Sequence, residues 1–140
     1  MNRYGLFSAY DTTKLFTSAL GLEEPWYVTS TEFRDTTDGS KELHIYINFE
    51  KGALFRCPME NCNQSGTAYD TIEHTWRHLN FFQYKTYIHT WQPRFKCPEH
   101  KVHLIPVPWA REGSGFTLLF EEAMCLEMIP HIRLLSRVRN

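Results

Sequence analysis

Apolar and polar side chains alternate most clearly between residues 26 and 50. From Lys41 to Glu50 every second residue is large and apolar, beginning with Leu43, and this period of two is typical of a strand with one buried face. Trp26–Arg34 is a second run of strand-forming residues, and Asp38-Gly39 between the two runs is a common turn dipeptide. The sequence therefore predicts a β-hairpin that packs one face against a core.

A helical period precedes this hairpin. Leu15, Ala19 and Leu22 recur at spacings of three and four residues, and Gly21 is a C-terminal stop signal. We therefore predict a short helix over Thr12–Leu22 with these three apolar side chains on its buried face.

A second helical period follows the flexible run Gly113-Ser114-Gly115. This helix is predicted to begin at Phe116 and to end near Pro130, with its apolar residues gathered on one face. Cys125, midway along it, is expected in the core. The basic stretch of residues 131–139 could form a further helix.

The middle of the chain is predicted to be rich in strands. Residues 57–73 show no period and many Asn, Ser, Gly and Thr, so they are predicted as a loop. Strand-like runs return at Tyr84–Trp91 and Val102–Val107, on either side of Pro93. These elements indicate an α+β fold with small antiparallel strands, an N-terminal helix and a C-terminal helix or helices.

A length of 140 residues suits a single domain over residues 1–140. Within it we expect an N-terminal helical segment (1–22), a β-rich module (23–111) and a helical tail (112–140). The chain is 42% hydrophobic, enough to close a core, yet no apolar run approaches the roughly 20 residues of a membrane span. With no signal-peptide pattern at its start, we expect a soluble, cytoplasmic protein without a membrane partner.

Charge is unevenly distributed along the chain. Residues 1–75 hold six Lys or Arg against eleven Asp or Glu, whereas residues 76–111 hold six against Glu99 alone, a net charge of +5. The whole chain nevertheless carries a formal charge of −1. The basic segment predicts a positive surface that could contact nucleic acid. Its six cations are Arg77, Lys85, Arg94, Lys96, Lys101 and Arg111.

The cysteines define a candidate metal site. Cys57-x4-Cys62 and Cys97-x2-His100 are two short turns, each opening with Cys-Pro, and together they supply the four N and S ligands that zinc prefers. In a chain without a secretory signal, metal binding is favoured over disulfides. The cation one residue before each turn, Arg56 or Lys96, is expected to favour the thiolate form of the cysteine beside it.

A second assignment of the metal site shares the first pair. Cys57, Cys62, His74 and His78 have nearly the spacing of a two-Cys, two-His finger, in which both histidines lie on a helix. Such a finger fills one core position with an aromatic residue, and that position is Gly66 here, which favours the three-Cys, one-His set. The remaining histidines are expected at the surface or in internal hydrogen bonds: His44, His89, His103 and His131.

Four stretches are distinctive in their order and spacing: Leu20–Trp26, Thr75–Gln83, Phe95–His100 and Val107–Thr117. The second contains Trp-Arg-His-Leu, and the fourth contains Pro-Trp-Ala-Arg-x-Gly-Ser-Gly-Phe-Thr. Together they resemble the zinc-finger N-terminal region of the ISL-three family of insertion-sequence transposases, over most of the chain.

The resemblance implies a zinc module followed by a helix-turn-helix, which together recognise transposon ends, and then a nuclease domain of RNase H type. This chain is expected to end within the helix-turn-helix, before its recognition helix and before the catalytic carboxylates, so no catalytic residue is assigned. The family commonly has a tighter Cys-Pro-x-Cys turn where this chain has Cys57–Cys62.

These observations favour a non-catalytic, transposase-like zinc module that binds DNA. Zinc would be structural, and the six cations of the basic segment would contact phosphates. The alternative is a transposase-derived interaction protein that binds and inhibits a partner, such as a full-length transposase or a nucleic-acid-targeting host defence complex. The acidic first half of the chain favours this alternative.

Overall fold

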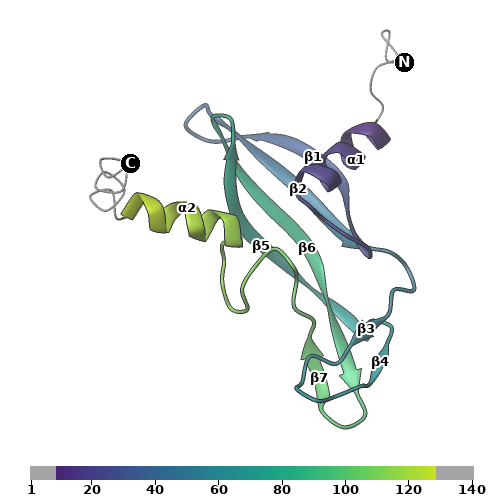
Figure 1. Cartoon of the computed structure of the whole chain (residues 1–140). Helices are drawn as coiled ribbons and strands as arrows, with labels where there is room; N and C mark the ends of the chain where they lie inside the picture. Colours follow the sequence, from purple (N-terminus) through teal and green to yellow (C-terminus); the bar gives the residue numbers. More distant parts are fainter. Residues whose placement is uncertain (1–8, 129–140) are drawn as a thin grey trace, which may run out of the picture.

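The computed structural model describes residues 9–128 and combines two helices with a set of strands (Figure 1). The elements in chain order are α1 (Ala9–Ala19), β1 (Trp26–Asp35), β2 (Lys41–Phe49), β3 (Phe55–Arg56), β4 (Ser65–Gly66), β5 (Asp70–Phe81), β6 (Tyr84–Cys97), β7 (Lys101–Leu104) and α2 (Leu118–Met128). The predicted α+β class is confirmed. No helix within residues 9–128 is long and apolar enough to cross a membrane.

A mixed sheet forms the body of the protein, where the sequence predicted small antiparallel strands. Its strand order is β1-β2-β6-β5, and β7 pairs with the last residues of β6. β1–β2 and β5–β6 are antiparallel hairpins, but β2 and β6 run parallel where the two hairpins meet. Parallel neighbours need a crossover connection, which the chain supplies here by passing through β3, β4 and β5.

β5 shows where the sequence pattern fails. The predicted loop of residues 57–73 contains β4 and the start of β5, so that prediction is wrong at both places. One face of β5 carries polar side chains such as Glu73 and Thr75, while the opposite face carries Ile72, which is 39% exposed, followed by His74 and Trp76. The strand is set instead by its backbone pairing with β6, which extends over nearly its full length.

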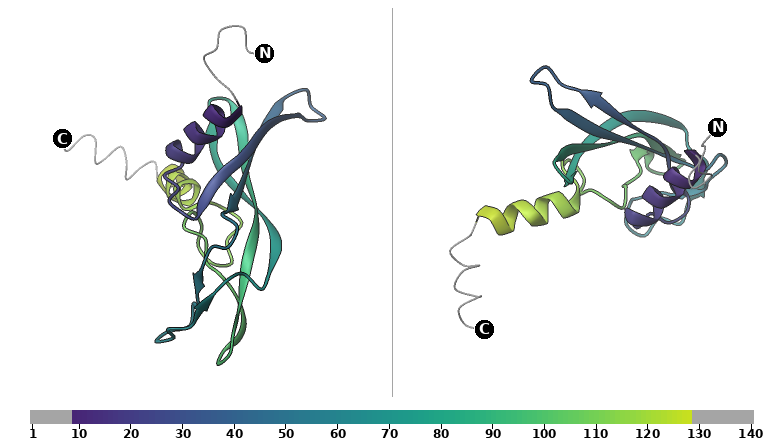
Figure 2. Two further views of the ribbon diagram at one scale, coloured as in Figure 1. Left: turned by 90° about the vertical axis from the view of Figure 1, so that its right-hand side faces the viewer. Right: turned by 90° about the horizontal axis from the view of Figure 1, so that it is seen from above.

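The predicted β1–β2 hairpin and its buried face are confirmed. Leu43, Ile45 and Ile47 of β2 are each 2% exposed, and Ile88 of β6 lies among them at 1%. Both helices lie on this side of the sheet (Figure 2). The opposite face of the sheet is left without a helix among the described residues.

α1 packs with a different face from the one predicted. Phe16 contacts Phe81, with ring centroids 5.6 Å apart, whereas Leu15 is 59% exposed. Thr17 explains this rotation, because its Oγ1 accepts a hydrogen bond from the N–H of Val28 in β1 at 2.9 Å. The polar contact with the strand edge therefore decides which apolar side chains turn inward.

The predicted C-terminal stop of this helix is confirmed. Gly21 has a φ of +68°, a left-handed conformation that glycine adopts without strain. Its N–H donates to the carbonyl of Ser18, and the N–H of Leu22 donates to that of Thr17. These two bonds form a Schellman motif, which directs Leu22 towards the core.

β6 passes through Pro93 without a break, so the predicted strand Tyr84–Trp91 extends well beyond its expected end. Pairing with β2 stops before Pro93, and pairing with β7 starts after it. The carbonyl of Pro93 accepts the N–H of Ile105 on that side. The N–H that proline lacks would face the carbonyl of Ile105, and Nε2 of Gln92 donates to that carbonyl instead, at 2.7 Å.

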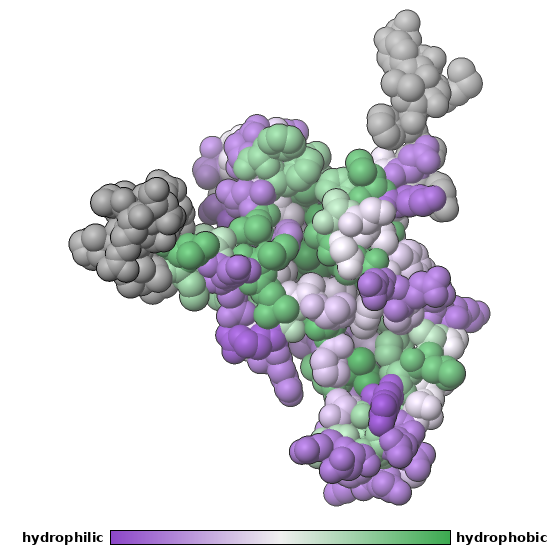
Figure 3. Space-filling view, in the orientation of Figure 1, coloured by the Kyte–Doolittle hydropathy of each residue, from purple (hydrophilic) through white to green (hydrophobic). Residues whose placement is uncertain are grey.

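α2 meets the rest of the protein mainly through β5, and much of its surface is uncovered (Figure 3). Leu118, Leu119, Met124 and Leu126 are between 39% and 54% exposed. Cys125 is exposed as well, so its predicted core position is wrong: the helix leaves the sheet after its first turn. The further helix suggested for residues 131–139 lies outside the described residues.

Replacing Ile88 by Ala tests the shared core. We expect Ile88→Ala to lower the free energy of unfolding by about 2–5 kcal/mol, because a buried aliphatic side chain is lost and a cavity remains. Denaturant unfolding of the zinc-loaded protein measures this. Leu15→Ala is the control and should change stability by less than about 0.5 kcal/mol; an equal loss in both variants would contradict the packing of α1 described above.

Candidate metal centre

The first pair of candidate ligands lies on the turn between β3 and β4, which form a separate two-stranded sheet. Cys57 opens this turn, and its N–H donates to the carbonyl of Gln64 at 2.9 Å. Cys62 closes it, and its N–H donates to the carbonyl of Met59 at 3.2 Å. Both cysteines are buried, at 4% exposed, so the turn holds its thiols towards the interior.

Arg56 and Gly66 fix this turn against β6. The guanidinium of Arg56 donates to the carbonyl of Cys62 at 3.1 Å and to Oδ1 of Asn63 at 2.6 Å. A Cβ on Gly66 would lie 3.1 Å from the ring of Phe95. The turn therefore packs closely on β6, and position 66 has no space for the aromatic residue of a two-Cys, two-His finger.

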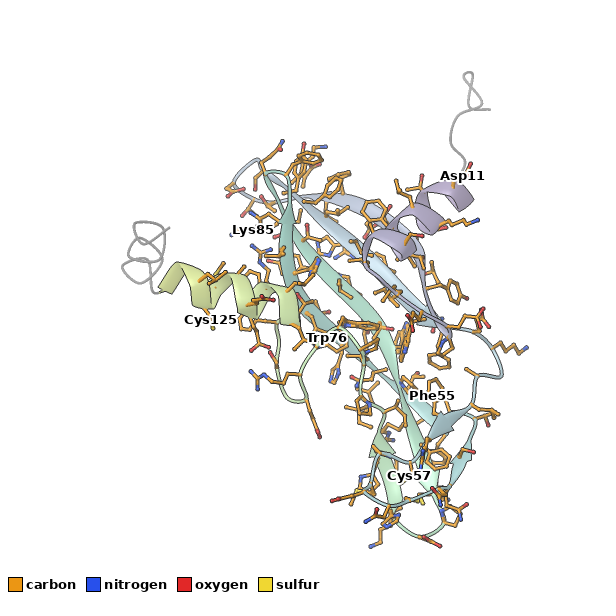
Figure 4. The ribbon with its side chains drawn as sticks, viewed as in Figure 1. Asp11, Phe55, Cys57, Trp76, Lys85 and Cys125 are labelled. Atoms are coloured by element: carbon orange, nitrogen blue, oxygen red, sulfur yellow. The ribbon has the colours of Figure 1, made fainter. Side chains whose placement is uncertain are left out.

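The second pair of candidate ligands lies on the turn between β6 and β7. Cys97 ends β6 at 2% exposed and pairs with Lys101, which begins β7. Lys101 has a φ of +65°, which bends the chain sharply after His100. Figure 4 shows Cys57 at this end of the molecule, far from Lys85 near the opposite end of β6.

The four candidate ligand atoms converge. Those of Cys57, Cys62, Cys97 and His100 all lie within 4.8 Å of one another. Sγ of Cys62 is 3.7 Å from Sγ of Cys97, and Nδ1 of His100 is 3.5 Å from Sγ of Cys97 and 3.8 Å from that of Cys57. Zinc bonds of about 2.3 Å to sulfur and about 2.0 Å to nitrogen, at tetrahedral angles, require separations of roughly 3.8 Å and 3.5 Å. The ligand atoms therefore fit a tetrahedral zinc ion.

Local N–H groups favour the thiolate form of Cys97. Burial opposes its ionisation, but the backbone N–H groups of Glu99 and His100 and the His100 ring outweigh burial and lower the pKa of Cys97 to about 6. At Cys62 the N–H of Gln64 acts in the same direction, but burial and the neighbouring thiols prevail and raise its pKa. Of these two thiols, Cys97 is therefore the first to ionise, and zinc binding would deprotonate both.

The rival two-Cys, two-His assignment is wrong. His74 and His78 lie on strand β5 and not on a helix. Nδ1 of His74 bonds to Oε1 of Gln92, and Nδ1 of His78 lies 2.8 Å from Oγ1 of Thr117. Both histidines thus serve internal hydrogen bonds away from Cys57, and within residues 9–128 the converging ligand group is the three-Cys, one-His set.

Comparison with known proteins shows which family the sequence around these ligands resembles. Residues 53–100 match the family model described as the zinc-finger of transposase IS204/IS1001/IS1096/IS1165. The matched range begins just before β3 and ends on His100, so it contains both turns. These residues are similar to the zinc ribbon of ISL-three-type transposases. The resemblance inferred from the sequence is confirmed.

The zinc ribbon is part of a wider similarity. The transposase for insertion sequence element IS1557, from two strains of Mycobacterium tuberculosis (CDC 1551 / Oshkosh and ATCC 25618 / H37Rv), is 27% identical over 115 residues. The match covers 79% of this chain, but the chain spans only 25% of the length of these relatives. No solved structure matches the chain at a significant level.

A structural zinc ion is the cofactor of this zinc ribbon. Its donors come from two turns that are separated by the 34 residues 63–96. Zinc binding therefore contributes directly to the folding free energy of this end of the protein.

The six cations of the basic segment do not form one surface. Arg94 forms an ion pair with Asp70, and Arg111 forms one with Glu121. Two of the six cations are therefore already paired with carboxylates of the fold. Lys96 and Lys101 flank the second turn of the zinc ribbon, while Lys85 lies near the other end of β6. These three lysines are exposed and form no ion pair with the described residues.

The two most specific stretches of the resemblance contact each other. The N–H of Arg77 donates to the carbonyl of Gly115, and the N–H of Thr117 donates to the carbonyl of Arg77, both at 2.9 Å. The rings of Trp76 and Trp109 pack edge to face with centroids 5.5 Å apart. We name this contact between residues 76–78 and 109–117 the clasp. It ties the segment before α2 to the edge of β5.

The side chain of Arg77 belongs to the same contact. Its guanidinium donates to the carbonyl of His78 at 2.7 Å and to Oδ1 of Asn80 at 2.8 Å. It also lies over the rings of Tyr87 and Phe120, 5.6 Å and 5.1 Å from their centroids. Sequence reasoning offered Arg77 as a phosphate contact and did not assign it this internal role.

Thr117 joins the clasp to α2. It is 1% exposed, and its Oγ1 accepts the N–H of Phe120 at 3.3 Å, which makes it the N-cap of the helix. The same oxygen bonds to Nδ1 of His78 at 2.8 Å. Burial and the neighbouring Arg77 lower the pKa of His78, which favours the neutral form of the ring.

Metal analysis of purified variants tests the zinc site. We expect one zinc ion per wild-type chain, and loss of both zinc and stability in Cys97→Ser, because the remaining three ligands cannot close a tetrahedral site. His74→Asn is the matched control and should keep its zinc. Zinc retained in Cys97→Ser but lost in His74→Asn would contradict the assignment.

A Thr117→Val substitution tests the clasp. Valine has nearly the same shape but no hydroxyl, so we expect the free energy of unfolding to fall by about 0.5–2 kcal/mol through loss of the helix cap. Thermal or denaturant unfolding measures this, with zinc content unchanged. Thr67→Val, at an exposed position, should stay within about 0.5 kcal/mol of wild type; equal effects would show that Thr117 does not cap α2.

Proposed function

We propose that this protein binds DNA through the zinc-ribbon end, in a binding role without catalysis of its own. The observation that carries the proposal is the position of Lys96 and Lys101. Both are exposed, both are free of ion pairs with the described residues, and zinc fixes the turn between them. Cations held at fixed positions suit the phosphate backbone, which dominates DNA affinity.

Two further observations support this end of the molecule as the DNA surface. It is largely hydrophilic (Figure 3), and Asn63 and Gln64 beside the first turn are exposed donors of the kind that also contact phosphates and sugars. The relatives named above are transposases for an insertion sequence element, and such a protein must engage DNA. Arg77, Arg94 and Arg111 contribute less to this surface, since their guanidinium groups already have partners in the fold.

Fluorescence anisotropy with labelled duplex DNA at two salt concentrations tests the proposal. We expect salt-sensitive binding by the zinc-loaded chain, and a salt slope that falls by about 0.9 for each phosphate contact removed in Lys96→Gln and Lys101→Gln. Lys14→Gln on α1 is the matched control and should bind like wild type. The zinc content and the free energy of unfolding must stay unchanged in all three variants. A loss of DNA binding then reflects the loss of a lysine–phosphate contact.

Two results would contradict DNA binding through this surface. One is the absence of binding at low salt with zinc bound. The other is an unchanged affinity and salt slope in the double variant of Lys96 and Lys101.

A protein-binding role is a second candidate, and the exposed apolar residues of α2 favour it. Leu118, Leu119, Met124 and Leu126 lie on one short helix, and uncovered apolar side chains grouped in this way are typical of interaction surfaces. This candidate corresponds to the interaction protein considered from the sequence. Recovery of a specific protein partner that resists nuclease treatment, and its loss in Leu119→Ser, would favour it over DNA binding.

A further inference from the structure

A continuous series of hydrogen bonds crosses the face of the sheet that lies opposite α1 and α2. Oγ1 of Thr75 lies 2.8 Å from Nδ1 of His89, and Nε2 of His89 lies 2.6 Å from Nδ1 of His44. Nε2 of His44 then lies 3.1 Å from Oε1 of Glu42. The four residues come from β5, β6 and β2, so the series spans both hairpins of the sheet.

One arrangement of protons satisfies every link when both rings are neutral. A neutral imidazole has one N–H and one lone pair, and an ionised carboxylate only accepts. Glu42 therefore requires the proton of His44 on Nε2, which leaves Nδ1 of His44 as an acceptor. His89 must then donate from Nε2 and accept on Nδ1, where the hydroxyl of Thr75 donates. The direction of every hydrogen bond in this series is therefore set by the single carboxylate of Glu42 at its end.

The two rings are enclosed by other side chains. His44 is 6% exposed although it lies on the uncovered face. The ring of Tyr87 lies 5.2 Å from that of His44, and the ring of Tyr46 lies 4.8 Å from that of His89, each within 18° of parallel. A cation lies over each of these tyrosines: the guanidinium of Arg34 is 5.9 Å from the centroid of Tyr46, and that of Arg77 is 5.6 Å from the centroid of Tyr87.

Charged groups from every neighbouring strand act on the pair. Burial lowers the pKa of His89, and His44 and Arg34 act in the same direction, while Glu73 and Glu32 oppose them more weakly. The charged side chains placed around the pair on this face are Glu32 and Arg34 of β1, Glu42 of β2, Glu73 and Arg77 of β5 and Lys85 of β6.

The hydrogen bond between the two rings survives the addition of one proton to the neutral pair, but not the addition of two. With one added proton, the pair still contains an N–H donor facing a lone pair, and the carboxylate of Glu42 offsets the charge. With both rings protonated, two N–H groups face each other across 2.6 Å, and no hydrogen bond remains between His44 and His89.

We propose that Thr75, His89, His44 and Glu42 form a proton-sensitive latch between the two hairpins. The latch is closed while the histidine pair carries at most one added proton, and it opens when both rings are protonated. β2 and β6 are the neighbours through which the β1–β2 hairpin joins the rest of the sheet. Opening the latch therefore loosens that hairpin, while zinc holds the far end of β6 independently.

The direction of the pH effect follows from the neutral rings. In the unfolded chain both histidines take up protons near their ordinary pKa of about 6.5, whereas the folded state keeps His89 neutral to lower pH. The stabilisation is thus fully present above about pH 6.5 and is lost as the pH falls. The unfolding equilibrium constant should rise by up to about tenfold per pH unit for the proton that folded His89 does not take up.

Histidine-selective ¹⁵N NMR of the full zinc-loaded chain, from about pH 8 to about pH 5, tests the latch directly. We expect the ring signals of His44 and His89 to change together and to show the two tautomers derived above at high pH, and we expect His89 to titrate below the midpoint of an exposed histidine. Glu42→Gln should move that midpoint further down, because it removes the charge that favours the protonated pair. Glu50→Gln, at the exposed residue after β2, is the control and should not move it.

Zinc content is measured in the same samples, because protonation of its ligands also destabilises the protein at low pH. Two results would overturn the proposal: independent titration of His44 and His89 at an ordinary histidine midpoint, or an unshifted midpoint in Glu42→Gln. The readout is a ring signal and not stability, so a poorly folded variant cannot imitate the expected result. Neither outcome depends on whether the protein binds DNA.

Discussion

The convergence of four ligand atoms at the end of β6 is the constraint on which the rest of the structure depends. The zinc-ribbon end has few large buried side chains beyond Phe55 and Phe95, so it has little apolar burial with which to offset the entropy of ordering two turns. Zinc coordination supplies the missing free energy. It also anchors β6, which pairs with β2, β5 and β7 and thus joins the two hairpins of the main sheet.

The two ends of the sheet are stabilised by different physics. At the zinc end, thiolates and an imidazole are held by short turns and backbone N–H groups. Beside the helices, an aliphatic and aromatic core is closed by the clasp, in which backbone bonds at Arg77 and the buried hydroxyl of Thr117 fix the start of α2. Residues 76–78 and 109–117 belong to the most specific stretches of the family resemblance. Their structural role is therefore to orient α2 relative to the sheet.

The sequence predicts those features that depend on local spacing. The β1–β2 hairpin follows from the alternation around Ile45, and the zinc ligands follow from two Cys-Pro turns whose chemistry leaves few alternatives. The α+β class follows from the same elements.

Features that depend on contacts between distant residues could not be predicted in this way. β5 has no aliphatic alternation, and the parallel pairing of β2 with β6 joins segments about forty residues apart, as in Ile45 with Ile88. The rotation of α1 depends on one hydroxyl, that of Thr17, bonding to β1. Cys125 was expected in the core because it lies midway along a helix predicted to be amphipathic, and only the structure shows that this helix leaves the sheet.

The unbroken course of β6 from Ile88 to Cys97 has a consequence for the accuracy of folding. Side chains on a strand alternate between faces, so a slip of one residue in strand pairing would expose Ile88 and turn Cys97 away from the other ligands at the same time. A misaligned sheet could not coordinate zinc with all four donors. Four-ligand coordination at one end therefore requires the same strand alignment that buries Ile88.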